Sequence, residues 1–326
     1  MGGRHACGWL ASRFPAVVLS IASVAASVAA AAAQTEDLSE ACKACHAPYY
    51  DTYQLTVHSK KGNPMAPANV GACGACHGDG TAHIRAGGGR GVGGIINPGS
   101  KSMPAEAKSN VCLSCHSDNR HLAFWDSGRH RKNDVACTNC HSIHTAATNP
   151  FLLRTDNPPI RPYVNTSQLP QQEICYACHR DIRALVMRPS HHPIPEGKIK
   201  CTSCHNPHGA LSPAMVNNES INQLCTSCHA DKRGPFMFEH PPVEENCLNC
   251  HNPHGSRSVK LLKEKVPNLC QDCHDAAQHP GSAYDLTESF RGSAPSSRFF
   301  ARGCLNCHNE IHGSNAPASR GRRFVR

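Results

Sequence analysis

Cys201-Thr202-Ser203-Cys204-His205-Asn206-Pro207-His208-Gly209 contains the pattern that decides the fold: two cysteines three positions apart, with a histidine directly after the second. Residues three and four apart share one face of a helix, so the two thiols and the imidazole point the same way. The thiols can then bond to the two vinyl groups of one haem while the histidine reaches its iron, which is c-type haem attachment. The pattern occurs ten times, so we expect ten covalently bound haem c groups.

The ten motifs use every cysteine of the chain except Cys7. The predicted attachment points are Cys42, Cys45, Cys73, Cys76, Cys112, Cys115, Cys137, Cys140, Cys175, Cys178, Cys201, Cys204, Cys225, Cys228, Cys247, Cys250, Cys270, Cys273, Cys304 and Cys307. The predicted proximal iron ligands are His46, His77, His116, His141, His179, His205, His229, His251, His274 and His308.

Two other uses of paired cysteines compete with haem attachment. Zinc ribbons combine two such pairs around one metal, and a secreted protein can use them in a disulfide framework. Neither use explains why a histidine follows the second cysteine in every copy. The regular histidine therefore favours haem.

Histidines outside the motifs recur in register with them and divide the chain into five two-motif units. Each unit runs motif, lone histidine, motif, second lone histidine, with bounds 42–83, 112–144, 175–208, 225–254 and 270–312. A lone histidine is usually a surface residue, but recurrence in every unit favours iron ligation. The predicted distal ligands are His58, His83, His130, His144, His192 (or His191), His208, His240, His254, His279 and His312.

One histidine, His121, is left over, together with one member of the His191–His192 pair. His192 is favoured because a His-Pro step also occurs at His240 and His279. In Cys204-His205-Asn206-Pro207-His208-Gly209 and its copy at 250–255, the two histidines approach from one side and cannot share an iron. We therefore expect His208 and His254 to serve neighbouring haems, with the proline ending the motif helix and the glycine allowing a sharp turn.

The first 33 residues resemble a signal peptide, leaving residues 34–326 as a single decahaem domain. Arg4 and Arg13 precede an uncharged, alanine-rich run, and Ala31-Ala32-Ala33 supplies a small-residue cleavage site. An uncleaved membrane anchor is the alternative, because the apolar run is just long enough to span a bilayer. Export to an oxidising compartment fits a chain with so many cysteines.

The composition does not predict a conventional hydrophobic core. Aromatic residues make up 5% and charged residues 17% of the chain, and no helical or strand period is sustained. We expect little regular structure, short α-helices at the motifs and no sizeable β-sheet, with the haems as the apolar interior. The formal charge of +9 does not indicate nucleic-acid binding, because each haem adds two propionates.

The chain resembles the periplasmic decahaem cytochromes of the MtrA, DmsE and PioA type, in the MtrA-like form without a long N-terminal extension. The resemblance is carried by the motif series and by the stretches 190–193, 233–243, 252–256 and 311–315. It implies bis-histidine haems in an elongated, staggered chain. It also implies an outer-membrane β-barrel porin as partner, with a periplasmic or inner-membrane cytochrome at one end and an extracellular multihaem cytochrome or terminal reductase at the other.

Axial ligation separates the functional classes that remain. Two histidines leave no open position on iron, which suits electron transfer rather than substrate chemistry. We therefore expect an electron conductor between periplasm and cell exterior, not an enzyme. A diffusing periplasmic shuttle is the alternative, and an oxyanion reductase would need an iron with a missing ligand. The sequence leaves open whether electrons flow outward to metal oxides or dimethyl sulfoxide, or inward from iron(II).

Overall fold

The computed structural model describes residues 37–144, 151–154, 171–274, 304–306 and 308–325. The chain divides into two units, Met1–Gln34 and Thr35–Arg326, and every described residue belongs to the second. The predicted leader lies outside the described residues, so its cleavage stays a prediction. Within the described ranges, no helix is both long and apolar enough to cross a membrane.

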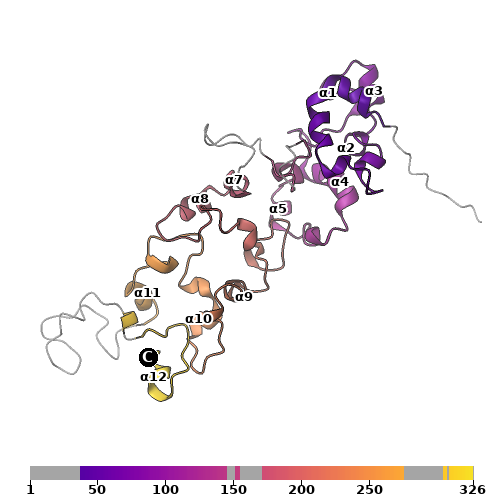
Figure 1. Cartoon of the computed structure of the whole chain (residues 1–326). Coiled ribbons are helices and arrows are strands. Elements are labelled where there is room, and N and C mark those ends of the chain that lie inside the picture. Colours follow the sequence, from indigo (N-terminus) through magenta and orange to yellow (C-terminus); the bar gives the residue numbers. More distant parts are fainter. Residues whose placement is uncertain (1–36, 145–150, 155–170, 275–303, 307, 326) are drawn as a thin grey trace, which may run out of the picture. The chain divides into compact units, whose positions relative to one another are not determined.

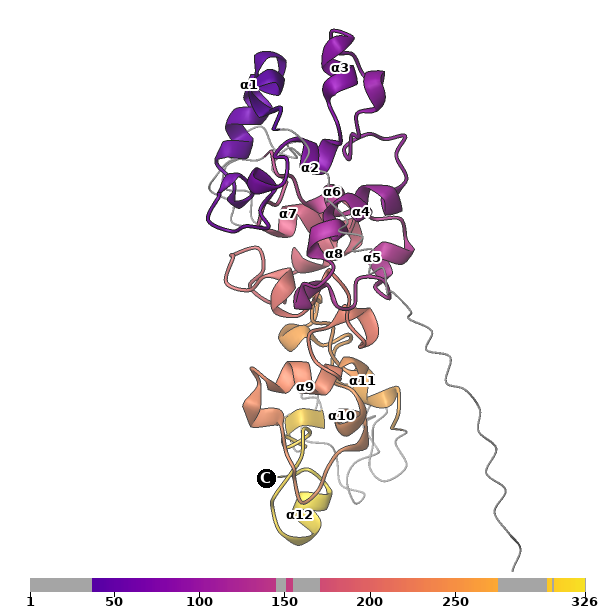
Figure 2. The same ribbon diagram turned by 90° about the vertical axis from the view of Figure 1, so that its right-hand side faces the viewer.

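Short helices joined by loops make up this second unit, and Figures 1 and 2 show no strand arrow among its coloured segments. The α-helices are α1 (Ser39–Gln54), α2 (Gly74–His77), α3 (Thr81–Arg85), α4 (Ala105–His116), α5 (Arg129–Lys132), α6 (Cys137–Cys140), α7 (Gln171–Tyr176), α8 (Arg180–Val186), α9 (Ile221–Thr226), α10 (Pro241–Glu245), α11 (Asn268–Gln271) and α12 (Ala318–Arg322). Single 3-10 turns are η1 (Val57–Ser59), η2 (Pro67–Asn69), η3 (Val92–Gly94), η4 (Arg120–Leu122), η6 (Cys201–Ser203), η7 (Pro213–Met215), η8 (Ala230–Lys232), η9 (Cys247–Asn249), η10 (Val259–Leu261) and η12 (Cys304–Asn306). The predicted fold class is confirmed for this part of the chain.

The two motifs of a unit begin differently. In each first motif a helix leads into the cysteines, as α4 does before Cys112, whereas in each second motif a one-turn helix starts at or next to the first cysteine, as η6 does at Cys201. Helix α1 is kinked at His46, two residues before Pro48, because proline has no N–H to donate and its ring crowds the preceding turn.

A returning loop follows the second motif of most units. Its backbone pairs with the motif histidine in three isolated antiparallel bridges, His141–Leu153, His205–Val216 and His251–Leu262. Each loop contains a non-glycine residue in the left-handed region, such as Ala214 (φ 55°) or Lys260 (φ 57°). The loop thereby turns back sharply enough to bring its carbonyls over the motif.

Neighbouring units interlock through backbone contacts. Ser190, two residues before His192, pairs with Ser256, two residues after His254, and Phe238 pairs with Ser314 in the same relationship. Gly255 lies at φ +153°, and a side chain there would overlap the carbonyl of Leu185. Glycine is therefore needed at this position both for its conformation and for the close approach.

The apolar core is small. Tyr176, Val186 and Ile194 form one buried cluster, with Ile182 and Ile199 packed against it. Trp125 and Tyr53 are also buried, but many large apolar side chains are exposed, including Leu211 at 84% and Val259 at 74%. Side-chain burial alone leaves much of the described backbone without a packed interior, as expected of a chain that folds around bound groups.

Candidate haem centres

Each motif forms one closed helical turn. The amide of His205 donates to the carbonyl of Cys201 at 2.9 Å, and the same bond recurs at His77, His141, His179, His229, His251, His274 and His308. No described cysteine forms a disulfide, and the described residues contain no cluster of three or more potential metal ligands. The zinc-ribbon arrangement, which needs four ligands around one ion, is therefore absent from these ranges.

The structure places nine motif histidines opposite nine of the lone histidines, with their rings close together. A metal–imidazole bond is about 2 Å long, so rings on opposite sides of one metal have centroids about 6 Å apart. The pairs and their centroid separations are His46–His83 (6.4 Å), His58–His116 (6.0 Å), His77–His144 (6.3 Å), His130–His179 (6.2 Å), His141–His208 (5.9 Å), His192–His229 (6.3 Å), His205–His254 (6.0 Å), His240–His274 (6.1 Å) and His251–His312 (6.2 Å). The residues therefore fit bis-histidine haems.

Most pairs cross from one unit to the next. The first lone histidine of a unit faces the first motif of the following unit, as His130 faces His179. The second lone histidine faces the second motif of the preceding unit, as His254 faces His205. His46 and His83 form the exception, because both belong to the first unit.

Backbone carbonyls orient the proximal histidines of the second motifs. An Nδ1–H that donates to a carbonyl fixes the tautomer and leaves Nε2 for a metal. Such bonds join His77 to Ile96 (2.8 Å), His141 to Phe151 (2.8 Å), His205 to Ala214 (2.9 Å), His251 to Lys260 (2.9 Å) and His308 to Arg323 (2.6 Å). The acceptors lie on the returning loops, so these loops have a direct role in the sites.

Several distal histidines are held in the same way. Nδ1 of His130 bonds the carbonyl of Pro207 at 2.8 Å, and Nδ1 of His192 bonds that of Pro253 at 2.7 Å. Each acceptor directly precedes the second lone histidine of the next unit. One short Asn-Pro-His segment therefore supplies a ring for one centre and orients the ring of another.

Burial favours the neutral form of many of the paired rings, which is the form that can bind metal. Desolvation is the largest cause of a lowered pKa at His58, His144, His208, His240, His251, His254 and His312. A neutral imidazole keeps the lone pair that a metal bond requires.

The structure distinguishes His192 from His191. His192 faces His229, whereas both nitrogens of His191 are engaged: Nδ1 with the carbonyl of Arg188, and Nε2 with Glu196 at 3.1 Å. These contacts raise the pKa of His191, the backbone bond being the larger cause. Of the two, only His192 lies opposite a motif histidine.

Three other predicted positions complete the comparison. His121, left over in the sequence, lies exposed on η4 and faces no motif histidine. His279 and Cys307 fall outside the described residues, so their roles stay predictions. The carbonyl acceptors were not foreseen from the sequence, because every residue type carries a backbone carbonyl.

The cysteines show that successive motifs are neighbours. Within each unit the first cysteines meet: a hydrogen bond between the thiols of Cys112 and Cys137 raises the pKa of Cys112 and lowers that of Cys137. Equivalent contacts join Cys42 to Cys73, Cys175 to Cys201, Cys225 to Cys247 and Cys270 to Cys304. Between units the second cysteines approach one another: Cys76 and Cys115, Cys140 and Cys178, Cys204 and Cys228, and Cys250 and Cys273. Burial is the largest cause of a raised pKa at the first member of each pair, and the neighbouring thiol raises that pKa further.

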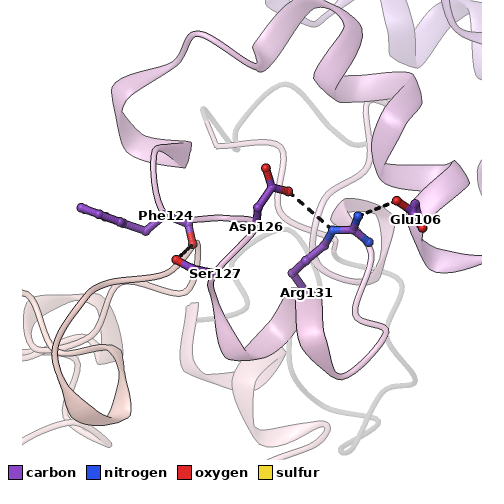
Figure 3. A network of polar contacts seen from close by, with 5 residues as sticks. All are labelled: Glu106, Phe124, Asp126, Ser127 and Arg131. Atoms are coloured by element: carbon purple, nitrogen blue, oxygen red, sulfur yellow. Dashed lines mark hydrogen bonds and ion pairs between the residues drawn. The ribbon is translucent and has the colours of Figure 1, made fainter.

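An ion-pair network supports the helix that carries His130. Figure 3 shows Arg131 of α5 between Glu106 of α4 (2.8 Å) and Asp126 (3.7 Å). Ser127 Oγ donates to the carbonyl of Phe124 at 3.1 Å in the same loop. Because α4 ends in the third motif, Arg131 ties a motif helix to the helix that carries the predicted distal ligand His130.

Comparison with known proteins agrees with this geometry. The family model described as "Doubled CXXCH motif" matches residues 191–234 and 240–279, "Cytochrome c-type protein NrfB-like" matches 73–161, and "Cytochrome c554 and c-prime" matches 16–78. The multiheme cytochrome MtrA of Shewanella baltica (strain OS185) is 39% identical over 267 residues, which cover 81% of this chain and 74% of the relative.

The chain belongs to the MtrA family of multihaem cytochromes. It is therefore an electron-transfer protein with covalently bound haem c, rather than an enzyme. As an MtrA-family chain it places its motif histidines and lone histidines in facing pairs across short, loop-connected helices.

Proposed function

We propose that this MtrA-family cytochrome binds ten bis-histidine haems and conducts electrons between the periplasm and the cell exterior through an outer-membrane porin. The observation that carries the proposal is the series of facing histidine pairs. Haem would supply the one-electron chemistry when bound, and each histidine pair would hold its iron and leave no open position for a substrate.

The order of the cysteines supports a wire rather than separate centres. First cysteines meet within a unit and second cysteines approach between units, so adjacent motifs in the sequence are also adjacent in space. Groups bonded to these cysteines would lie edge to edge in the order of the chain. An electron entering at one end would then have a short step at every motif.

The porin, the redox partners and the association with the outer membrane rest on membership of the MtrA family. We propose a periplasmic or inner-membrane cytochrome at one end of the wire, and an extracellular multihaem cytochrome or terminal reductase at the other. The haem pairs serve flow in either direction: outward to metal oxides or dimethyl sulfoxide, or inward from iron(II).

The test uses the mature holoprotein and its candidate porin in liposomes loaded with a redox dye. The conduit predicts that the two proteins copurify from outer membranes and that external dithionite bleaches the enclosed dye only when both are present. Porin alone and cytochrome alone are the controls. A cytochrome that fractionates entirely with the soluble periplasm and never confers conduction would instead be a diffusing shuttle.

A further inference from the structure

The centre of the second motif, formed by His77 and His144, and the centre of the third motif, formed by His58 and His116, differ in the hydrogen bonds that hold their histidines. At the second, both rings donate to carbonyls: His77 to Ile96 at 2.8 Å and His144 to Tyr49 at 3.1 Å. It is the one described pair in which both rings have such bonds. The Tyr49 ring also meets His144 edge-on at 5.2 Å, fixing the imidazole further.

At the third centre neither ring has a carbonyl partner. Nδ1 of His58 is buried without a hydrogen-bond partner among the described residues, and His116 is exposed with no protein group bonded to its ring. His240 also has a buried Nδ1 without a hydrogen-bond partner, but its ring lies only 15° from the plane of His274.

The planes of the two pairs differ as well. The rings of His77 and His144 lie 30° apart, whereas those of His58 and His116 lie 74° apart. Every other described pair is less crossed than His58–His116, with the largest values 59° for His130–His179 and 49° for His192–His229. The third centre therefore combines a buried Nδ1 without a hydrogen bond and the most crossed planes of the described pairs.

Both differences act on the reduction potential in the same direction. An imidazole that donates its Nδ1–H becomes a stronger electron donor to iron and stabilises the ferric state. A buried imidazole without an acceptor donates less, and burial opposes the extra charge of ferric iron. Planes closer to parallel stabilise ferric iron further, because both rings act on the same iron d orbital, whereas crossed planes divide that effect between two orbitals. Five described pairs, at 13° to 21°, are closer to parallel than His77–His144, so the low potential of the second centre rests on its two carbonyl bonds.

We propose that the His77–His144 and His58–His116 pairs build a step in reduction potential into the wire, with the second centre the most negative and the third the most positive of the nine described. The two centres are neighbours, since the thiols of Cys76 and Cys115 lie close together. One electron passing from the second to the third oxidises one iron and reduces the other, with no further reactant. The step favours passage toward the third centre and retains an electron there.

This inference rests on the bis-histidine ligation proposed above. The first test is a potentiometric titration of the unmodified holoprotein, followed by electron paramagnetic resonance. Strongly crossed histidine planes give a low-spin ferric signal with a very large gmax, and near-parallel planes give an ordinary rhombic signal. We expect the largest-gmax signal to vanish first on reduction and a rhombic signal to vanish last. The reverse order would overturn the proposal.

Ligand variants assign the signals to residues. His58→Met should abolish the largest-gmax signal and shift the most positive component, whereas His144→Met should remove the most negative component. His254→Met is the matched control: its pair is nearly parallel at 13°, so the largest-gmax signal and both extreme components should persist. If His58→Met leaves the largest-gmax signal intact, the assignment is wrong. A high-spin ferric signal in the unmodified protein would instead contradict the ligation itself.

Discussion

His205 and His254 lie face to face, with ring centroids 6.0 Å apart and planes 13° from parallel, although one belongs to the third two-motif unit and the other to the fourth. The same relationship joins His141 of the second unit to His208 of the third. In both pairs the lone histidine comes from the unit that follows the motif histidine. The units defined by sequence are therefore not the units within which these histidines pair.

His254→Ala should therefore open the centre of the sixth motif, not that of its own eighth motif. We expect one high-spin ferric haem in the electronic spectrum, because the ring opposite His205 is lost. Adding Cys201→Ala and Cys204→Ala should remove that high-spin signal together with its haem. Adding Cys247→Ala and Cys250→Ala should leave it in place. Loss of the signal only in the second combination would show that pairing stays within the unit.

His192→Ala should produce one high-spin haem, and His191→Ala should leave every haem low-spin, because Glu196 and the Arg188 carbonyl already engage both nitrogens of His191. Carbon monoxide binding to the reduced protein gives a second measurement, since only an open iron binds it. His121→Ala is a further control and should bind none. Carbon monoxide binding to the His191 variant alone would reverse the assignment.

Denaturing mass spectrometry should show the mature chain, starting near Gln34, with ten haem masses attached. The last centre is the sharpest point of this prediction, because Cys307 and His279 lie outside the described residues. The Cys304→Ala, Cys307→Ala double variant should lose one haem mass. A mass unchanged by that substitution would mean that the tenth motif carries no haem.

Gly255→Ala should destabilise the fold by about 2 kcal/mol or more, because the new methyl group would overlap the Leu185 carbonyl and the backbone lies at φ +153°. Thermal unfolding followed by haem absorbance measures the effect. Gly62→Ala is the matched control, since nothing lies within 4 Å of its added Cβ. Equal melting temperatures for the two variants would show that the contact between units has no part in stability.

The short motif helices, and the lack of a sheet in the part of the chain that the structure describes, could be predicted because Cys-x-x-Cys-His is a local signal that one helical turn satisfies. The identity of each pair could not be predicted. Spacing shows that His205 and His208 cannot share an iron, but it does not reveal that His208 faces His141 and His254 faces His205. That choice depends on long-range backbone contacts, such as Ser190 with Ser256, which leave no mark in composition or periodicity.

The carbonyl acceptors were beyond prediction for a related reason. Ala214, Lys260 and Phe151 have unlike side chains, yet each offers its backbone oxygen to a motif histidine. What they share is the position of the returning loop. Ala214 and Lys260 also share the left-handed backbone, which these residue types rarely adopt.

The cross-unit pairing also limits how such a chain can change length during evolution. Duplicating one whole internal unit would add two motifs and two lone histidines in register, so every iron would still find a partner. Gaining or losing half a unit would instead leave one iron without its second histidine, and one lone histidine without a motif histidine opposite it. We therefore expect such chains to lengthen by complete pairs of motifs, which predicts an even number of haems.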